Sequence, residues 1–167
     1  MNSLSEQSEK VKLHSSHTSA HIKGFFGEYR WLSNFHLCPV HFDGFSYPSS
    51  ENFYQALKVK RGNRVFFQDV SPHESKLIRM AMIYSTEEWN NIRIQAMKLA
   101  LLCKFTQNKD LFAQLLQTGD KYLEETNWWG DCFWGTDVNS VGQNNLGKLL
   151  MNLRNELHSH SDVLRLW

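Results

Sequence analysis

The chain has 167 residues, which is enough for one domain or at most two very small ones. Its 18 basic and 17 acidic residues leave a formal net charge of +1 and form no basic run, which argues against a nonspecific grip on a nucleic-acid backbone. No window approaches about 18 apolar residues and the polar N-terminus lacks a signal-peptide core, so we expect a cytosolic protein without a membrane span.

Metal and disulfide chemistry find little support in the composition. The three cysteines lie far apart and show no CxxC spacing, which fits neither a disulfide framework nor a structural zinc site. Most of the histidines lie near the two chain ends in polar, Ser-rich sequence, where mobile tails explain them better than a metal site does. We therefore expect neither a bound metal nor a cofactor.

The N-terminal segment, residues 1–22, is rich in Ser, His, Lys and Glu and has few apolar positions, so we predict a disordered tail. The folded domain is expected to span residues 23–158, with residues 159–167 forming a C-terminal tail. From Phe25 to Tyr47, aromatic residues interrupted by Gly and Pro predict short strands, two of them joined by an Asp-Gly turn.

The remainder of the domain is predicted to be mostly helical, on the evidence of caps, prolines and apolar periodicity. Together these elements indicate an α+β fold: a mostly helical single domain with a small β-sheet contributed mainly by the first third of the chain. The predicted helices are 50–59 capped by Ser49 or Ser50, one beginning at Ser71-Pro72, 86–105 capped by Thr86, 110–117, and 144–158.

Glu51 and Lys58 are the first candidates for catalysis. Because a helix turns by about 100° per residue, two residues seven apart point within about 20° of each other, and Gln55 lies between them. Glu51 also falls in the first turn, where the helix dipole favours a carboxylate. A solvated polar face has the same spacing, so the pattern alone leaves both interpretations open.

The segment 127–135 is dense in Trp and Gly. Glycine lets a backbone approach a ligand closely, and tryptophan offers a flat stacking surface. Asp131 lies among three tryptophans and could act as an acid or a base. A tight turn whose tryptophans fill the core explains the same residues, so two hypotheses remain open here as well.

Smaller polar groups accompany these segments. Ser33 and Asn34 lie in a loop between apolar anchors, and Asn145 lies in a Gly- and Asn-rich helix start whose free N–H groups could hold phosphate or simply be capped. Arg93 interrupts an apolar stripe, and a buried arginine needs an anionic partner. Lys104 fits either the same role or an exposed helix end.

Taken together, these segments resemble the NADAR superfamily, which includes the YbiA-like N-glycosidases. They occur in family order over about residues 24–157, and the ordered set is far more specific than any single piece. The matching pieces are 32–35, Gly44 and Tyr47, 50–58, Trp89, Arg93, Met97, Leu101, 104–105, 115–119, 131–135, 145–151 and Arg154.

The resemblance implies a YbiA-like fold and hydrolysis of the bond between C1′ of a phosphorylated ribose and a nitrogen of a heterocyclic amine. Some family members resemble enzymes that split ribosylamino intermediates of riboflavin synthesis, and others resemble hydrolases that remove ADP-ribose from guanine bases. A non-catalytic module that binds ADP-ribose or NAD is a further alternative. The implied partner is a small ribosyl or ADP-ribosyl molecule or an ADP-ribosylated nucleic acid, with no membrane; the oligomeric state stays open.

Carried over residue by residue, the family's glutamate falls on Glu51 and its helix lysine on Lys58. A lysine amine can attack the ring-opened sugar and form a Schiff base while the glutamate moves protons. In the alternative, Glu51 or Asp131 activates water and the other protonates the leaving nitrogen. The substrate contacts implied by the resemblance are Phe26, Ser33, Asn34, Trp89, Arg93, Lys104, Trp134, Gly135 and Asn145.

Three positions depart from the family pattern. Asn52 follows the glutamate where His is common, Asp137 stands where a Gly often recurs, and the stretch between His73 and Tyr84 lacks an expected glycine. We expect these departures to affect the choice of substrate more than the type of reaction.

Overall fold

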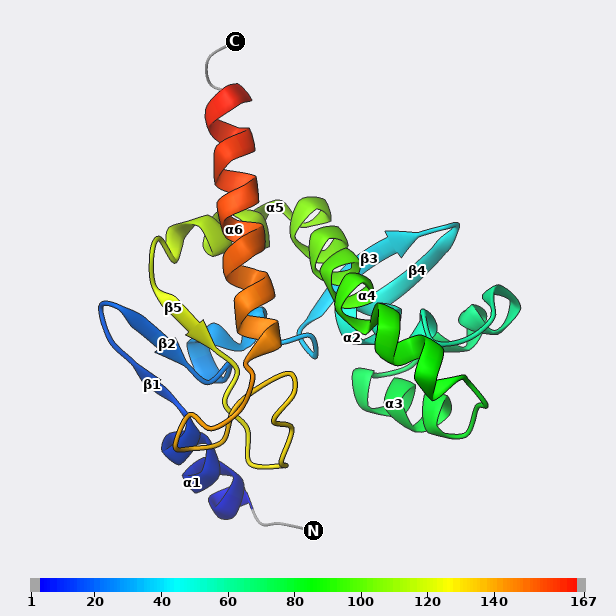
Figure 1. The fold of residues 1–167 in the computed structure, drawn as a ribbon, viewed down its shortest axis with the longest axis horizontal. Coiled ribbons are helices and arrows are strands. Elements are labelled where there is room, and N and C mark those ends of the chain that lie inside the picture. The colour runs from blue at the N-terminus through cyan, green and yellow to red at the C-terminus, as the bar shows by residue number, and fades with distance from the viewer. Residues whose placement is uncertain (1–3, 165–167) are drawn as a thin grey trace. The chain divides into compact units, whose positions relative to one another are not determined.

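The computed structural model describes residues 4–164 of the chain (Figure 1). It confirms the predicted α+β class, with helices beside two small sheets. The chain divides into two compact units, one built from residues through Ser33 together with those from Leu115 onward, the other from Asn34–Gln114. None of the helices within residues 4–164 is long and apolar enough to cross a membrane.

The first unit contains a three-stranded sheet of order β1-β2-β5. Strand β2 pairs antiparallel with β1 and parallel with β5, and in the parallel pair Ile22 stands opposite Leu123. Both side chains are fully buried, so this pair lies in the core of the unit. The elements are α1 (Leu4–His14), β1 (Ser16–His17), β2 (His21–Lys23), the 3-10 helix η1 (Gly27–Leu32), β5 (Tyr122–Glu124) and α6 (Asn145–Leu164), with α5 (Lys109–Gln117) crossing the sequence boundary between the units.

The second unit places a β-hairpin beside three helices, with α2 packed against β4, α3 and α4. The hairpin turn has positive φ angles at both Asp43 (51°) and Gly44 (81°), as the two-residue turns that match strand twist require, and it confirms the predicted Asp-Gly hairpin. The elements are β3 (Leu37–Phe42), β4 (Phe45–Ser49), α2 (Ser50–Ala56), the 3-10 helix η2 (Arg61–Phe67), α3 (Pro72–Met80) and α4 (Thr86–Gln107).

Side-chain caps begin the helices of this unit. Ser49 caps α2 by accepting a hydrogen bond from the Asn52 backbone, which decides between the two predicted caps, Ser49 and Ser50. Ser71 forms a reciprocal capping box with Glu74, and α3 begins after it at the predicted position. The predicted cap of α4 is wrong by one residue, because Ser85, not Thr86, accepts the hydrogen bond of an orphan backbone N–H.

The predicted disordered tail differs from the structure, which forms α1, β1 and β2 within residues 4–23. His14, the one buried residue of α1, packs edge-on against Trp128 with ring centres 5.6 Å apart. Ile22 aligns with Leu123 in the sheet. Two anchors in an otherwise polar stretch leave no periodic signal, which explains why composition predicted disorder.

The C-terminal end also differs from the prediction, because α6 continues as a helix past residue 158 to Leu164. Residues 165–167 of the predicted tail lie outside the described part of the chain.

Candidate active site

Helix α2 is unusual in that all seven of its residues are buried, the polar ones included. Glu51 is 6% exposed, Gln55 4% and Asn52 0%. The hypothesis of a solvated polar face is therefore wrong. Buried polar groups require partners, and the Asn52 amide finds two by donating to the carbonyl oxygens of Phe67 and Val70.

Glu51 is held at both its side chain and its backbone. Gln55 Nε2 donates a 2.6 Å hydrogen bond to Glu51 Oε1. The backbone N–H of Glu51 donates to the carbonyl oxygen of Asn34 at 3.1 Å, and Ser50 Oγ donates to Asn34 Oδ1 at 3.0 Å. The structure thus brings the predicted residue Asn34 next to Glu51, where it fixes the start of α2.

Lys58 lies in the turn that follows α2, since its backbone N–H donates to the carbonyl oxygen of Gln55 at 3.1 Å, three residues back. Its Nζ lies 4.6 Å from the ring centre of Tyr54 and 5.1 Å from that of Trp89. The two rings meet edge to face, with centres 5.2 Å apart. Aromatic faces attract a cation electrostatically, and within the described chain the Lys58 ammonium has neither a hydrogen-bond acceptor nor an ion-pair partner.

The surroundings of Lys58 change its acidity. Burial lowers the pKa of Lys58 from 10.5 to about 8. The carboxylate of Glu51 acts in the opposite direction, while Arg79 and Lys76 lower the pKa further. A lysine with this pKa has an appreciable fraction of neutral amine near physiological pH, which is the form that acts as a nucleophile.

The other predicted residues of the second unit lie on α4. Trp89 is 7% exposed and faces Lys58, whereas Arg93, one helical turn further on, is half-buried. Lys104 is fully buried with its Nζ 5.2 Å from the ring centre of Phe105, so the hypothesis of an exposed helix end is wrong. The polar and aromatic cluster of this unit consists of Asn34, Glu51, Lys58 and Trp89.

In the first unit, Asp131 is built into a tight turn. Its Oδ1 accepts hydrogen bonds from the backbone N–H groups of Phe133 and Trp134, at 3.1 and 2.9 Å. The Asn127 side chain in turn donates to the Asp131 carbonyl oxygen and accepts from its N–H. Aspartate commonly organises turns in this way, so the geometry favours the turn hypothesis over a role as acid or base.

Gly135 and Asn145 also contact backbone groups of this unit. A Cβ on Gly135 would collide with the carbonyl oxygen of Glu125, so only glycine fits this close approach of two backbones. Asn145 Nδ2 donates to the carbonyl oxygen of Phe133 at 2.8 Å and ties the start of α6 to the turn.

The aromatic residues of the first unit pack against one another. Phe26 stacks on Trp128 with ring centres 5.1 Å apart and an interplanar angle of 24°. Trp134 is half-buried and meets Phe133 edge to face, and Ser33 is buried.

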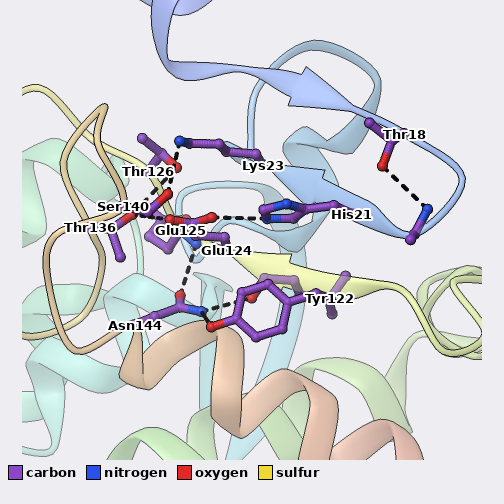
Figure 2. Close-up of polar contacts among 12 residues, drawn as sticks. Thr18, His21, Lys23, Tyr122, Glu124, Glu125, Thr126, Thr136, Ser140 and Asn144 are labelled. Atoms are coloured by element: carbon purple, nitrogen blue, oxygen red, sulfur yellow. Dashed lines mark hydrogen bonds and ion pairs between the residues drawn. The ribbon is translucent and has the colours of Figure 1, made fainter.

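A polar network holds the segment between β5 and α6 in place (Figure 2). The buried carboxylate of Glu124 lies 2.9 Å from His21 Nε2 and accepts a 2.7 Å hydrogen bond from Thr136 Oγ1. Asn144 accepts from the Glu125 N–H and donates to the Tyr122 hydroxyl. These contacts fix both ends of the loop that carries Asp131.

Comparison with known proteins identifies the family of this chain. The family model described as the NADAR domain matches residues 22–158. The chain belongs to the NADAR family. It is 34% identical over 136 residues to the N-glycosidase YbiA of Escherichia coli, a match that covers 78% of this chain and 82% of that protein. The NADAR fold is also shared with the NMR structure of E. coli YbiA, at 30% identity and a TM-score of 0.75, covering 91% of this chain and 93% of the other.

A second relative of this NADAR domain is a riboflavin biosynthesis protein of Vibrio vulnificus, 36% identical over 134 residues. The match covers 78% of this chain and 36% of that protein, so the chain spans about a third of the relative's length. Helix α1 and strand β1 precede the segment that the family model matches.

Sequence reasoning missed three features of this NADAR domain. Tyr54, predicted only to pack, contributes a ring beside the Lys58 ammonium, and the amide of Gln55 bonds the Glu51 carboxylate. The position of Tyr54 and Gln55 between Glu51 and Lys58 in the sequence could have indicated that they contact these residues. Nothing in the local sequence indicated the Glu124 network, because its partners are far apart in the chain.

No group of three or more His, Cys, Asp or Glu that could hold a metal occurs within residues 4–164.

Proposed function

We propose that the protein is an N-glycosidase that hydrolyses the bond between C1′ of a phosphorylated ribose and a nitrogen of a heterocyclic amine, as found in ribosylamino intermediates of riboflavin synthesis. The observation that carries this proposal is a buried glutamate, Glu51, beside Lys58, a lysine whose pKa is lowered to about 8. The prediction of a hydrolase for N-glycosyl bonds is confirmed as a reaction class by the relatives named N-glycosidase YbiA. The relative named a riboflavin biosynthesis protein supports the choice of substrate.

Lys58 is the proposed nucleophile. Glu51 relays a proton from water to the ring oxygen of the ribose, the ring opens, and C1′ becomes an iminium carbon bonded to the amine nitrogen. The neutral Lys58 amine adds to C1′, the heterocyclic amine leaves with a proton relayed by Glu51, and a Schiff base joins Lys58 to the sugar. Water then adds to this imine, releasing the sugar and restoring the lysine.

A second mechanism needs no covalent bond. Glu51, or Asp131, activates water against an oxocarbenium-like C1′ while the other carboxyl group protonates the leaving nitrogen. The two hydrogen bonds that Asp131 Oδ1 already accepts weigh against this assignment. Activity that survives Lys58→Ala would favour the water route.

Removal of ADP-ribose from guanine bases is the alternative function, and binding of ADP-ribose or NAD without turnover is a third. The net charge of +1 and the lack of a basic run favour a small molecule over a nucleic acid.

The test is a substrate panel comparing a ribosylaminopyrimidine 5′-phosphate with ADP-ribosylated guanine in DNA, in RNA and as a nucleotide. We expect release of the sugar phosphate from the first; release from a guanine substrate alone would reverse the assignment. The cytoplasmic location inferred from the sequence stays a prediction.

A further inference from the structure

Gln55 is a buried amide with only one of its two ends occupied. Its side chain is 4% exposed, and Nε2 donates to Glu51 Oε1 at 2.6 Å. Its Oε1 is buried and accepts no hydrogen bond from any residue in the described range. An ionised carboxylate only accepts hydrogen bonds, so the NH2 group must face Glu51 and the carbonyl oxygen must face away.

The Lys58 amine is a donor that lies close to Gln55 in the chain. Lys58 follows Gln55 by three residues in the turn that ends α2, and its backbone N–H donates to the Gln55 backbone carbonyl oxygen at 3.1 Å. Its Nζ rests against two aromatic rings with no acceptor among the described residues. Among the described residues, Gln55 Oε1 is thus a buried acceptor without a donor and Lys58 Nζ is a donor without an acceptor, and the lysine stem is flexible enough to bring the two atoms together.

We propose that Gln55 is a positioning residue that couples Glu51 to Lys58: its NH2 group fixes the carboxylate, and its side-chain carbonyl oxygen accepts a hydrogen bond from the Lys58 amine, which exchanges between this acceptor and the Tyr54 and Trp89 rings in the free protein. This bond uses one N–H of the amine and leaves the nitrogen lone pair directed at C1′. The inference rests on the proposed function, in which Lys58 attacks the sugar.

The main variant is Gln55→Met, which keeps the length of the side chain and removes both amide contacts. Gln55→Asn restores an amide with a shorter reach and is expected to fall between wild type and Gln55→Met. Gln68→Met is the matched control, because Gln68 is a glutamine of the same unit whose Oε1 accepts a hydrogen bond from the backbone N–H of Ser46. Thermal unfolding of each variant establishes that it folds; where Gln55→Met does not, Gln55→Asn carries the test.

The first measurement needs no substrate. Lys58 is acetylated with acetic anhydride at a series of pH values and quantified by peptide mass spectrometry, since only the neutral amine reacts. An acceptor stabilises the ammonium form, so Gln55→Met is expected to move the midpoint of Lys58 labelling to lower pH, while Gln68→Met leaves it at about 8. An unchanged midpoint in Gln55→Met overturns the proposed contact.

The second measurement is steady-state hydrolysis of a ribosylaminopyrimidine 5′-phosphate. Misplacing a nucleophile and its proton donor costs about 10²-fold in kcat, so we expect a loss of roughly this size in Gln55→Met with KM changed by less than about threefold, and partial rescue in Gln55→Asn. A wild-type kcat in Gln55→Met overturns the positioning role. If wild-type protein itself hydrolyses no substrate, the proposed function fails, and the labelling midpoint still decides the contact between Gln55 and Lys58.

Discussion

The Nζ atom of Lys58 lies 5.1 Å from the centre of the Trp89 ring. An aromatic face attracts the ammonium form without tying it into an ion pair, so the charge is stabilised only partly. The neutral amine that remains accessible is the species that a Schiff-base mechanism requires.

The pH dependence of activity should follow this lysine. Lys58 must be neutral to attack C1′, and its pKa in the folded protein is about 8. We expect kcat/KM for a ribosylamino substrate to rise between about pH 6 and 8 and to level off above pH 9, because kcat/KM reports ionisations of the free enzyme. A rate profile that is flat from pH 7 to 9 would contradict a nucleophilic Lys58.

Replacing Lys58 should stabilise the fold while removing activity. The pKa of Lys58 is about 8 in the folded protein and 10.5 in the unfolded chain, so burying the charged ammonium lowers the free energy of unfolding. This loss of stability is fully present below pH 8, where the lysine is charged in both states. This cost fades as pH rises from 8 to 10.5. Allowing for solvent screening, we expect Lys58→Met to gain about 1–2 kcal/mol in urea unfolding at pH 7 and almost nothing at pH 10.5. A loss of stability at pH 7 would show that the ammonium is stabilised by its surroundings.

The contact between His21 and Glu124 should be important for stability. His21 Nε2 lies 2.9 Å from the buried Glu124 carboxylate, which also accepts a hydrogen bond from Thr136 (Figure 2). We expect His21→Ala to cost about 2–3 kcal/mol of unfolding free energy. The control is His41→Ala, since His41 is exposed and contacts Gln107 through its backbone N–H and carbonyl oxygen. Equal unfolding free energies for the two variants would refute the anchoring role.

Helix α1 should depend on His14. An isolated helix of 11 residues is marginal in water, and His14 is its buried residue, packed on Trp128. We expect His14→Ala to accelerate amide hydrogen exchange across Leu4–His14 and to shift Trp fluorescence to longer wavelength as Trp128 is exposed. Leu13→Ala is the control, because Leu13 is 64% exposed. Unchanged exchange in His14→Ala would mean that other contacts hold the helix.

Local sequence signals predicted local structure well. Asp43-Gly44 fixed the hairpin turn through its positive φ angles, and Ser49 and Ser71 marked the starts of α2 and α3. Each of these signals depends on backbone groups within a few residues, so one sequence suffices to read it.

Features that depend on tertiary contacts could not be predicted from the sequence. The N-terminal residues looked disordered because their order comes from His14 on Trp128, more than a hundred positions along the chain. Asp131 looked like a candidate acid because only the structure shows its Oδ1 bonded to two backbone N–H groups. Likewise, the burial that separates Glu51 from an ordinary surface glutamate comes from helices packed around α2.

The central claim is that Lys58 bonds covalently to the sugar during hydrolysis, with Glu51 moving the protons. The most direct measurement is borohydride reduction during turnover of a ribosylaminopyrimidine 5′-phosphate, followed by peptide mass spectrometry. We predict a reduced sugar-phosphate adduct on Lys58 in wild-type protein, neither adduct nor hydrolysis in Lys58→Ala, and severe loss of both in Glu51→Gln. Undiminished hydrolysis by Lys58→Ala, with no adduct trapped on the wild-type protein, would contradict the claim.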